Sequence, residues 1–213
     1  MKKLIATLAL CLVSAAAQAT DYDFSGTFAK DNDILRFNFS VGAASNVTVF
    51  SSSWDDGGFD PILAIWTSTG TKIYQQDDGG NTGTTYSNGV AYDHGKWDSY
   101  YQVLLSAGDY IATVAQYSNF SNSNTLSDGF QQDDNPNFTY DLGYGGATQP
   151  YFNGVWDDDD PRTGNWAFHL LNVAAAEVID PNTPVPEPST LLLLGGGLAG
   201  LALARRRFAK NKR

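Results

Sequence analysis

The sequence predicts an all-β protein, an antiparallel β-sandwich or jelly roll of about eight strands, between a cleavable N-terminal signal peptide and one C-terminal transmembrane helix. Apolar and polar residues alternate with period two; Leu35, Phe37 and Phe39, for example, are separated by polar residues. Gly, Asn and Asp gather between the alternating runs, and no segment before the C-terminal tail has a helical period. Short strands joined by polar turns are typical of sandwiches and jelly rolls.

Eight segments have this alternation and are the expected strands. They cover residues 22–29, 34–41, 46–52, 62–67, 72–76, 100–105, 110–117 and 166–173. Gly108-Asp109 is expected to form a tight hairpin turn before Tyr110, and Asp60-Pro61 an Asx turn before the fourth strand. Residues 20–176 then form one domain, with a polar insertion at 118–160.

The first 19 residues have the order of a secretory signal peptide. Lys2 and Lys3 form the charged region, an apolar stretch follows at residues 4–13, and Ala17 and Ala19 fit a cleavage site of the A-x-A kind. The mature chain is expected to begin near Thr20. Cys11, the one cysteine of the sequence, would leave with this peptide, so disulfides cannot stabilise the exported domain.

The C-terminal segment has the order of a membrane anchor. A linker at 177–188 precedes the apolar run 189–204, which is long enough for a helix of roughly 24 Å against a hydrocarbon core of roughly 30 Å. Its three consecutive glycines would weaken a water-soluble helix but are common in membrane helices. The basic tail 205–213 is then cytoplasmic by the positive-inside rule, and the preceding domain lies outside.

At these residues the chain resembles the PEP-CTERM signal of Gram-negative bacteria. The resemblance is carried by the motif and the arginine cluster that flank the apolar run, namely Val185, Pro186, Glu187, Pro188, Arg205, Arg206 and Arg207. It implies that exosortase recognises and cleaves the tail. The inner-membrane anchor would therefore be transient, and the protein would end at the cell surface or in the extracellular polysaccharide matrix. A plain proline-rich linker before an anchor is the alternative.

The domain itself resembles the pre-peptidase C-terminal (PPC-like) β-sandwich family. The resembling elements run in order from about Phe24 to Tyr117 and are Phe24-Ser25-Gly26, Asp31-Asn32-Asp33, Phe59-Asp60-Pro61-Ile62-Leu63, Gly70, Asp77-Asp78 and Leu105-Ser106-Ala107-Gly108-Asp109-Tyr110. The resemblance implies a non-catalytic accessory or surface domain, in some members one that carries calcium or binds a polymer. It does not cover the insertion at 118–160.

The exported part is strongly acidic. Eight of the 13 Lys and Arg residues lie in the two ends that would be removed, so five remain against 23 acids, a net charge near −18. This charge argues against nucleic acid or an anionic polysaccharide as a direct electrostatic partner. All but Glu177 and Glu187 of these acids are Asp, a residue that suits both turns and calcium sites.

A calcium site is one interpretation of Asp60, Asp77 and Asp78. Asp77 and Asp78 are adjacent carboxylates whose repulsion a cation would relieve, and a hairpin of the strands at 62–67 and 72–76 would bring Asp60 to them. Solvated turns are the alternative. The other acidic groups, at 55–56, 133–134 and 157–160, are weaker candidates, and none has EF-hand spacing.

Trp97 and Trp156 are the candidate ligand-binding residues, because exposed aromatic rings in Gly-rich loops can stack on sugars or peptides. The alternative is that such rings cap the ends of the core. An enzyme is not expected: the sequence has no nucleophile elbow, zinc spacing or phosphate loop. His169 lies opposite in phase to Trp166, Phe168 and Leu170 and is expected to face solvent.

The sequence therefore predicts an exported, non-catalytic surface or extracellular-matrix protein, associated with exopolysaccharide and sorted by its tail. A calcium-dependent carbohydrate- or protein-binding module is the alternative function, and a secreted hydrolase is a third class. Exosortase and the inner membrane are the expected partners during sorting, an exopolysaccharide or other surface polymer afterwards, and Ca²⁺ is the one cofactor considered.

Overall fold

The computed structural model describes residues 19–143, 148, 151–153 and 162–179. The signal-peptide residue Ala17, the sorting motif, the apolar run 189–204, the basic tail and Trp156 lie outside these residues. The strands are β1 (Thr20–Thr27), β2 (Leu35–Val41), β3 (Ser45–Ser51), β4 (Pro61–Thr67), β5 (Lys72–Gln76), β6 (Gly83–Ser87), β7 (Val90–His94), β8 (Tyr100–Leu105), β9 (Gly108–Gln116), β10 (Asn165–Val173) and β11 (Ala175–Ile179). A short 3₁₀ turn (Leu126–Asp128) and the one-turn helix α1 (Phe138–Asp141) complete the elements.

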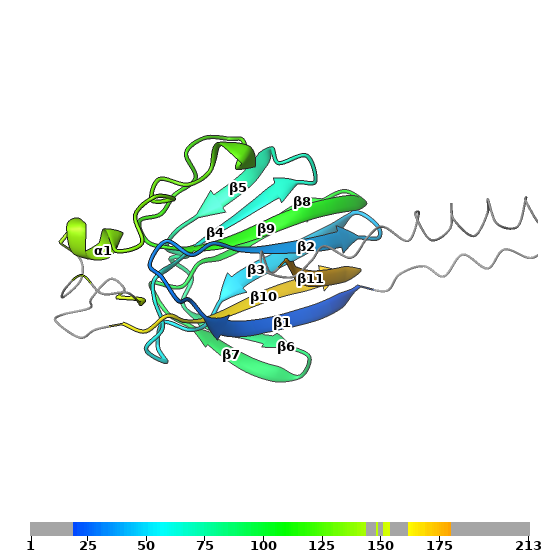
Figure 1. Cartoon of the computed structure of the whole chain (residues 1–213). Helices are drawn as coiled ribbons and strands as arrows, with labels where there is room; N and C mark the ends of the chain where they lie inside the picture. The colour runs from blue at the N-terminus through cyan, green and yellow to red at the C-terminus, as the bar shows by residue number, and fades with distance from the viewer. Residues whose placement is uncertain (1–18, 144–147, 149–150, 154–161, 180–213) are drawn as a thin grey trace, which may run out of the picture. The chain divides into compact units, whose positions relative to one another are not determined.

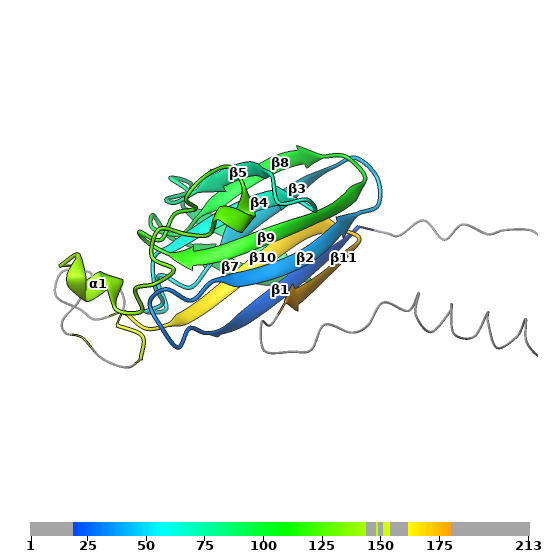
Figure 2. The ribbon, with the colours of Figure 1, turned by 45° about the horizontal axis from the view of Figure 1, so that its top comes forward.

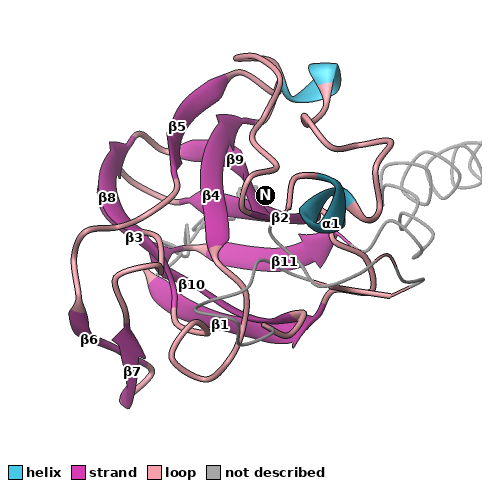
Figure 3. Cartoon of the chain, turned by 90° about the vertical axis from the view of Figure 1, so that its left-hand side faces the viewer, coloured by secondary structure: helices cyan, strands magenta, loops and turns pink. Residues whose placement is uncertain are grey.

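Two antiparallel sheets form the domain (Figure 1). Sheet A has the strand order β1-β10-β3-β8, and sheet B has the order β11-β2-β9-β4-β5. The chain crosses repeatedly from one sheet to the other, which is the connectivity of a jelly roll. A separate two-stranded hairpin, β6-β7, lies on the side of sheet A that faces away from sheet B (Figure 3).

The main hydrophobic core lies between the two sheets. Phe37 of sheet B and Phe168 of sheet A are both fully buried, and their ring centroids are 4.5 Å apart. The alternating apolar residues of the predicted strands supply the other core side chains, among them Phe39, Val47, Val49, Leu63, Ile65, Val114 and Leu170. Burial of these inward faces is the main favourable contribution to folding of a domain that has no disulfide.

The insertion covers the part of the outer face of sheet B that lies over β4. Strand β4 is buried on both faces: Leu63 and Ile65 belong to the main core, whereas Trp66 packs in a second cluster with Leu126 and Phe130. Figure 2 shows the segment between β9 and α1 on this side of the sheet. A strand buried on both faces has a continuous apolar run rather than a strict alternation, as β4 does.

Asp31 connects the later part of the insertion to the sandwich. Its carboxylate is fully buried and accepts hydrogen bonds from the Thr139 hydroxyl and from the backbone amide of Asn153, the latter at 2.6 Å. The Gln116 side chain donates to the Asp31 carbonyl oxygen at 3.4 Å. The described parts of the insertion are therefore an integral layer of the domain.

The structure confirms the eight predicted strands and adds β6, β7 and β11. The expected hairpin at Gly108-Asp109 is wrong, because both residues lie inside β9 and the preceding strand β8 belongs to the other sheet. The chain crosses between sheets at Ser106-Ala107 instead. Glu177, expected in the linker, pairs with Asn38 in β11, so sheet B continues to Ile179.

Candidate functional site

Asp60, Asp77 and Asp78 meet at one end of sheet B. Asp60 directly precedes β4, and the other two directly follow β5. Since β4 and β5 are antiparallel, with Leu63 opposite Gln76, the beginning of β4 and the end of β5 lie at the same end of the sheet. Each residue offers one carboxylate oxygen, and the three oxygens all lie within 4.8 Å of one another. The structure thus brings together the three residues that the sequence singled out.

Backbone oxygens of the same segments crowd around Ser99, the residue before β8. The Ser99 hydroxyl lies 2.7 Å from the Pro61 carbonyl oxygen, 3.1 Å from that of Gln76, and also contacts that of Asp77. A hydroxyl has only one hydrogen to donate, so it cannot satisfy three carbonyl oxygens at once. This junction therefore gathers several backbone oxygen atoms around one hydroxyl.

The loop after β5 approaches β8 as closely as the backbone allows. Gly79 donates its amide to the Asp98 carbonyl oxygen at 2.8 Å, and a Cβ at Gly79 would lie 2.7 Å from the Tyr100 nitrogen. A larger residue would push the loop away from the strand. Gly79 therefore fixes the position of Asp77 and Asp78 relative to sheet A.

Burial and mutual repulsion keep protons on this cluster. Burial, followed by the charges of Asp77, Asp78 and Asp98, raises the pKa of Asp60 to about 9, against a smaller opposing effect of Arg162. Burial and the charge of Asp78 raise the pKa of Asp77 to about 7. Burial also raises the pKa of Asp78, which Lys96 opposes. The site is therefore short of positive charge.

Two carboxylate oxygens of the cluster lack a donor. Asp60 is 7% exposed, and its Oδ1 has no hydrogen-bond partner among the described residues; the same is true of the buried Oδ1 of Asp77. A buried polar atom without a partner is costly and rare in native proteins. Within the described part of the chain, no other group of acidic, His or Cys side chains has metal-ligand geometry, so the pairs at 55–56 and 133–134 do not form such a group. Residues 157–160 lie outside it.

Trp97 lies in the loop that leads from β7 to the Ser99 junction. It is half-buried, its ring centroid is 6.0 Å from that of the buried Trp54, and the Lys96 ammonium lies 4.1 Å from its ring centroid. The Arg162 guanidinium covers the other indole, 3.6 Å from the Trp54 ring centroid. Trp97 thus presents one partly exposed ring two residues before Ser99, whereas Trp54 is buried.

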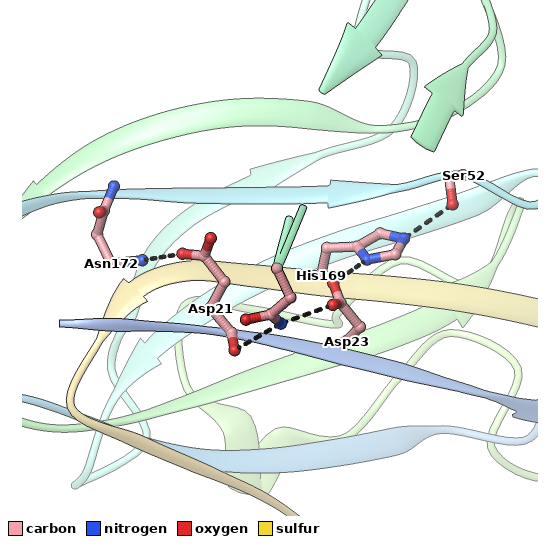
Figure 4. A network of polar contacts seen from close by, with 6 residues as sticks. Asp21, Asp23, Ser52, His169 and Asn172 are labelled. Carbon is pink, nitrogen blue, oxygen red and sulfur yellow. Dashed lines mark hydrogen bonds and ion pairs between the residues drawn. The ribbon is translucent and has the colours of Figure 1, made fainter. Parts of the chain in front are cut away.

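A second polar network lies on the outer face of sheet A (Figure 4). His169 Nδ1 is 2.7 Å from Asp23 Oδ1, and His169 Nε2 is 2.8 Å from the Ser52 hydroxyl. The prediction that His169 faces solvent is wrong: it does point away from the core, but it is 1% exposed. Its ring packs between Phe50 and Tyr92, with centroids 4.3 Å and 4.1 Å away.

The β6-β7 hairpin is what buries His169, and a sequence signal for it was overlooked. Asn88-Gly89 stands between two short alternating runs, and both residues have positive φ, +50° and +80°, as a two-residue hairpin turn requires. The Asn88 amide donates to the Asp21 carbonyl oxygen at 3.1 Å and to Asp23 Oδ2 at 2.9 Å. Asp23 therefore holds both the hairpin and His169 against sheet A.

The pKa values of the two titratable groups of this network, His169 and Asp23, are both lowered. Burial lowers the pKa of His169 and outweighs the opposing hydrogen bond and charge of Asp23, so the imidazole is neutral at pH 7. Burial tends to raise the pKa of Asp23, but the polar Ser87 side chain, the hydrogen bonds from His169 and Asn88, and the His169 charge lower it overall. Both groups thus hold fewer protons in the folded chain than in free solution.

His169 contacts Asp23 through one ring nitrogen and Ser52 through the other, which is the contact pattern of Ser-His-Asp acyl-transfer sites. Such sites also need amide groups directed at the reacting oxygen. Here the Ser52 amide donates to the Ala167 carbonyl oxygen, and the Ser53 amide donates to Asp98 Oδ1 at 3.2 Å. These two amides, the nearest in sequence to the hydroxyl, already have acceptors inside the domain.

Comparison with known proteins identifies the tail. The PEP-CTERM protein-sorting motif matches residues 184–207, a range that contains Val185, Pro186, Glu187, Pro188 and the cluster Arg205 to Arg207. The chain is therefore an exported protein with an exosortase sorting signal and a transient membrane anchor, as in Gram-negative bacteria that bring such proteins to the cell surface. No curated protein matches the chain. Among the described residues, no helix is long and apolar enough to span a membrane.

Proposed function

We propose that the exported domain is a non-catalytic component of the cell surface or of the extracellular polysaccharide matrix. The single observation that carries this proposal is the sorting motif at 184–207, behind an acidic β-domain. The PPC-like resemblance is part of the proposal, since two packed antiparallel sheets are compatible with such an accessory domain. The net charge near −18, from five basic and 23 acidic residues, favours a neutral polymer or a cation-bridged one.

Sorting is tested on the protein isolated from cells with and without exosortase. Mass spectrometry of the C-terminus should find the residues after Pro188 removed in the exosortase-positive strain and retained in the deletion strain. Fractionation should then find the processed protein at the cell surface or in the polysaccharide matrix. Processed protein that is free in the medium and absent from both fractions contradicts the matrix role, and an intact tail in both strains contradicts cleavage.

A calcium-dependent carbohydrate- or protein-binding module is the second candidate function. The observation that favours it is the partly exposed ring of Trp97, in a loop that continues into the oxygen-rich junction at Ser99. The Trp97→Ala variant should lose most binding on a glycan array or in a pull-down, because stacking area is removed. The Tyr86→Ala variant is the control, since Tyr86 is an exposed aromatic residue of the separate β6-β7 hairpin. Equal binding by wild type and Trp97→Ala contradicts this function.

A further inference from the structure

The junction of β4, β5 and β8 gathers carboxylate and carbonyl oxygen atoms, and two of the carboxylate oxygens have no donor among the described residues. Three carboxylate oxygens lie within 4.8 Å of one another, and three carbonyl oxygens share one Ser99 hydroxyl. The Oδ1 atom of Asp60, a residue more than nine-tenths buried, has no donor among the described residues. This buried oxygen is an observation separate from the clustering of charge, because burial without a partner would be costly for a single carboxylate too.

The nearby basic side chains do not neutralise the cluster. Lys96 lies over the Trp97 ring, and the Arg162 guanidinium donates to the carbonyl oxygens of Gly58, at 2.8 Å, and Trp54. Among the described residues, neither forms an ion pair with the three aspartates. A cation from outside the chain could contact all three carboxylates at once and relieve their repulsion.

We propose that Asp60, Asp77 and Asp78 bind one Ca²⁺ ion, which joins the beginning of β4 to the end of β5 next to the beginning of β8. All three ligands flank strands of sheet B, and the same segments contact the beginning of β8 in sheet A through the Ser99 hydroxyl and the Gly79 amide. The ion would therefore fix the sheet-B side of this contact between the sheets. The site is independent of how the chain is sorted.

The chemistry of the donors favours calcium over other metals. All of them are oxygens, with no imidazole or thiolate in the group, which argues against zinc or copper. Calcium accepts six to eight oxygens in irregular geometry, whereas Mg²⁺ requires a near-ideal octahedron. Asp78 is exposed, so water can complete the coordination from its side. Sites of this kind in extracellular modules bind calcium with dissociation constants of about 0.1–1 mM.

The test uses the protein as it is released from cells, with calcium alone as the probe. Equilibrium dialysis should find about one bound ion per chain, and about 10 mM CaCl₂ should raise the thermal midpoint by about 3–10 °C relative to chelator. An equal concentration of MgCl₂ should produce a smaller shift. Absence of binding and of any midpoint shift at this calcium concentration overturns the proposal.

Three variants locate the ion. Asp60→Asn and the pair Asp77→Asn/Asp78→Asn should each lose the calcium shift and the bound ion. The pair Asp55→Asn/Asp56→Asn is the matched control: it removes two adjacent, exposed carboxylates outside the cluster and should keep both. If Asp60→Asn does not fold, the single variant Asp78→Asn, at an exposed position, gives the same test. Equal calcium binding by wild type and all these variants places the ion elsewhere and overturns the proposal.

Discussion

Asp23 and Asp60 are aspartates in two parts of the same sandwich whose pKa values are shifted in opposite directions. Asp23, on the outer face of sheet A, accepts hydrogen bonds from His169 and Asn88, and its pKa is lowered despite partial burial. Asp60, at the junction of the sheets, faces two further carboxylates, and its pKa is raised to about 9, with burial as the largest cause. The depth of burial, the number of donors around the carboxylate and the charges of its neighbours together decide the direction of the pKa shift.

Asp98 shows that a buried carboxylate need not destabilise the fold when it has hydrogen-bond donors. It is 1% exposed, yet it accepts the Ser51 hydroxyl at 2.9 Å, the Ser53 amide at 3.2 Å and the Gly95 amide at 2.9 Å. Asp98 is thus a structural residue of the loop before β8, whereas Asp60 is left with an unpartnered oxygen. A partnered carboxylate stabilises its surroundings, and an unpartnered one marks a place for a ligand.

Removal of the fully partnered carboxylate has the largest expected effect. Asp98→Ala should lower the free energy of unfolding by about 3–5 kcal/mol, because several buried donors lose their acceptor at once. Urea unfolding measures this difference. Asp109→Ala, at an exposed position of β9, is the control and should change stability by less than about 0.5 kcal/mol. A loss below about 1 kcal/mol for Asp98→Ala would show that these hydrogen bonds do not stabilise the domain.

Substitution of Asp60, which has an unpartnered oxygen, is expected to stabilise the domain rather than destabilise it. In chelator at pH 7, Asp60→Asn should raise the free energy of unfolding by about 1–2 kcal/mol, because the folded chain must take up a proton at the buried Asp60, whose pKa is raised to about 9, whereas Asn needs none. The measurement is urea unfolding beside Asp55→Asn, an exposed aspartate that should leave stability nearly unchanged. Destabilisation by Asp60→Asn in chelator would remove the contrast with Asp98.

Asp23→Ala should have a smaller and local effect. It leaves the His169 Nδ1 hydrogen and the Asn88 amide without their carboxylate, which costs about 1–2 kcal/mol. Hydrogen exchange should become faster in β6 and β7 relative to the β4-β9 pair, because the hairpin is held to sheet A through Asp23. Unchanged exchange in the hairpin would show that Asp23 does not hold it.

His169 should make the domain lose stability as the pH falls. Its pKa in the folded chain is below the ordinary value of 6.5, so the unfolded chain takes up a proton first, and stability falls below about pH 6.5. The charged or titratable groups that act on His169 are Asp23, Asp98 and His94, and Tyr92 packs against its ring. We expect a loss of about 1 kcal/mol between pH 7 and pH 5 relative to His169→Gln, measured by urea unfolding. A His169 pKa above 6.5 in an NMR titration would contradict this.

The smallest expected effect is that of Ser52→Ala on labelling by a serine-reactive probe, which we expect to be absent. A fluorophosphonate probe, which reacts with activated serine nucleophiles, should label the wild type no more than Ser52→Ala. The physical reason is that the Ser52 and Ser53 amides have other acceptors, so they do not stabilise a developing oxyanion. Stoichiometric labelling that disappears in Ser52→Ala would overturn the proposed non-catalytic role and favour the hydrolase alternative.

Sequence reasoning predicted the parts of the structure that depend on local patterns. The alternation in β2 and β10 indicated half-buried strands, and the hairpin of β4 and β5 was enough to expect Asp60 beside Asp77 and Asp78. The β6-β7 hairpin was missed although its Asn88-Gly89 turn is a local signal. His169 was assigned to the correct face of β10 but to the wrong environment, because the chain that covers it is β6-β7, more than 70 residues earlier in the sequence.

The sequence by itself determined the all-β class, the eight main strands, the acidic character of the exported domain and the sorting motif, since each of these depends on composition or on short-range spacing. Only the tertiary structure decided which aspartates are partnered. Two donors to Asp98, the Ser51 hydroxyl and the Ser53 amide, come from a segment distant in the chain, and burial depends on what the insertion and the hairpin cover. The donors around a carboxylate are set by this three-dimensional environment, so one aspartate, Asp98, is a structural residue with several donors, and another, Asp60, is a candidate calcium ligand with an unpartnered oxygen.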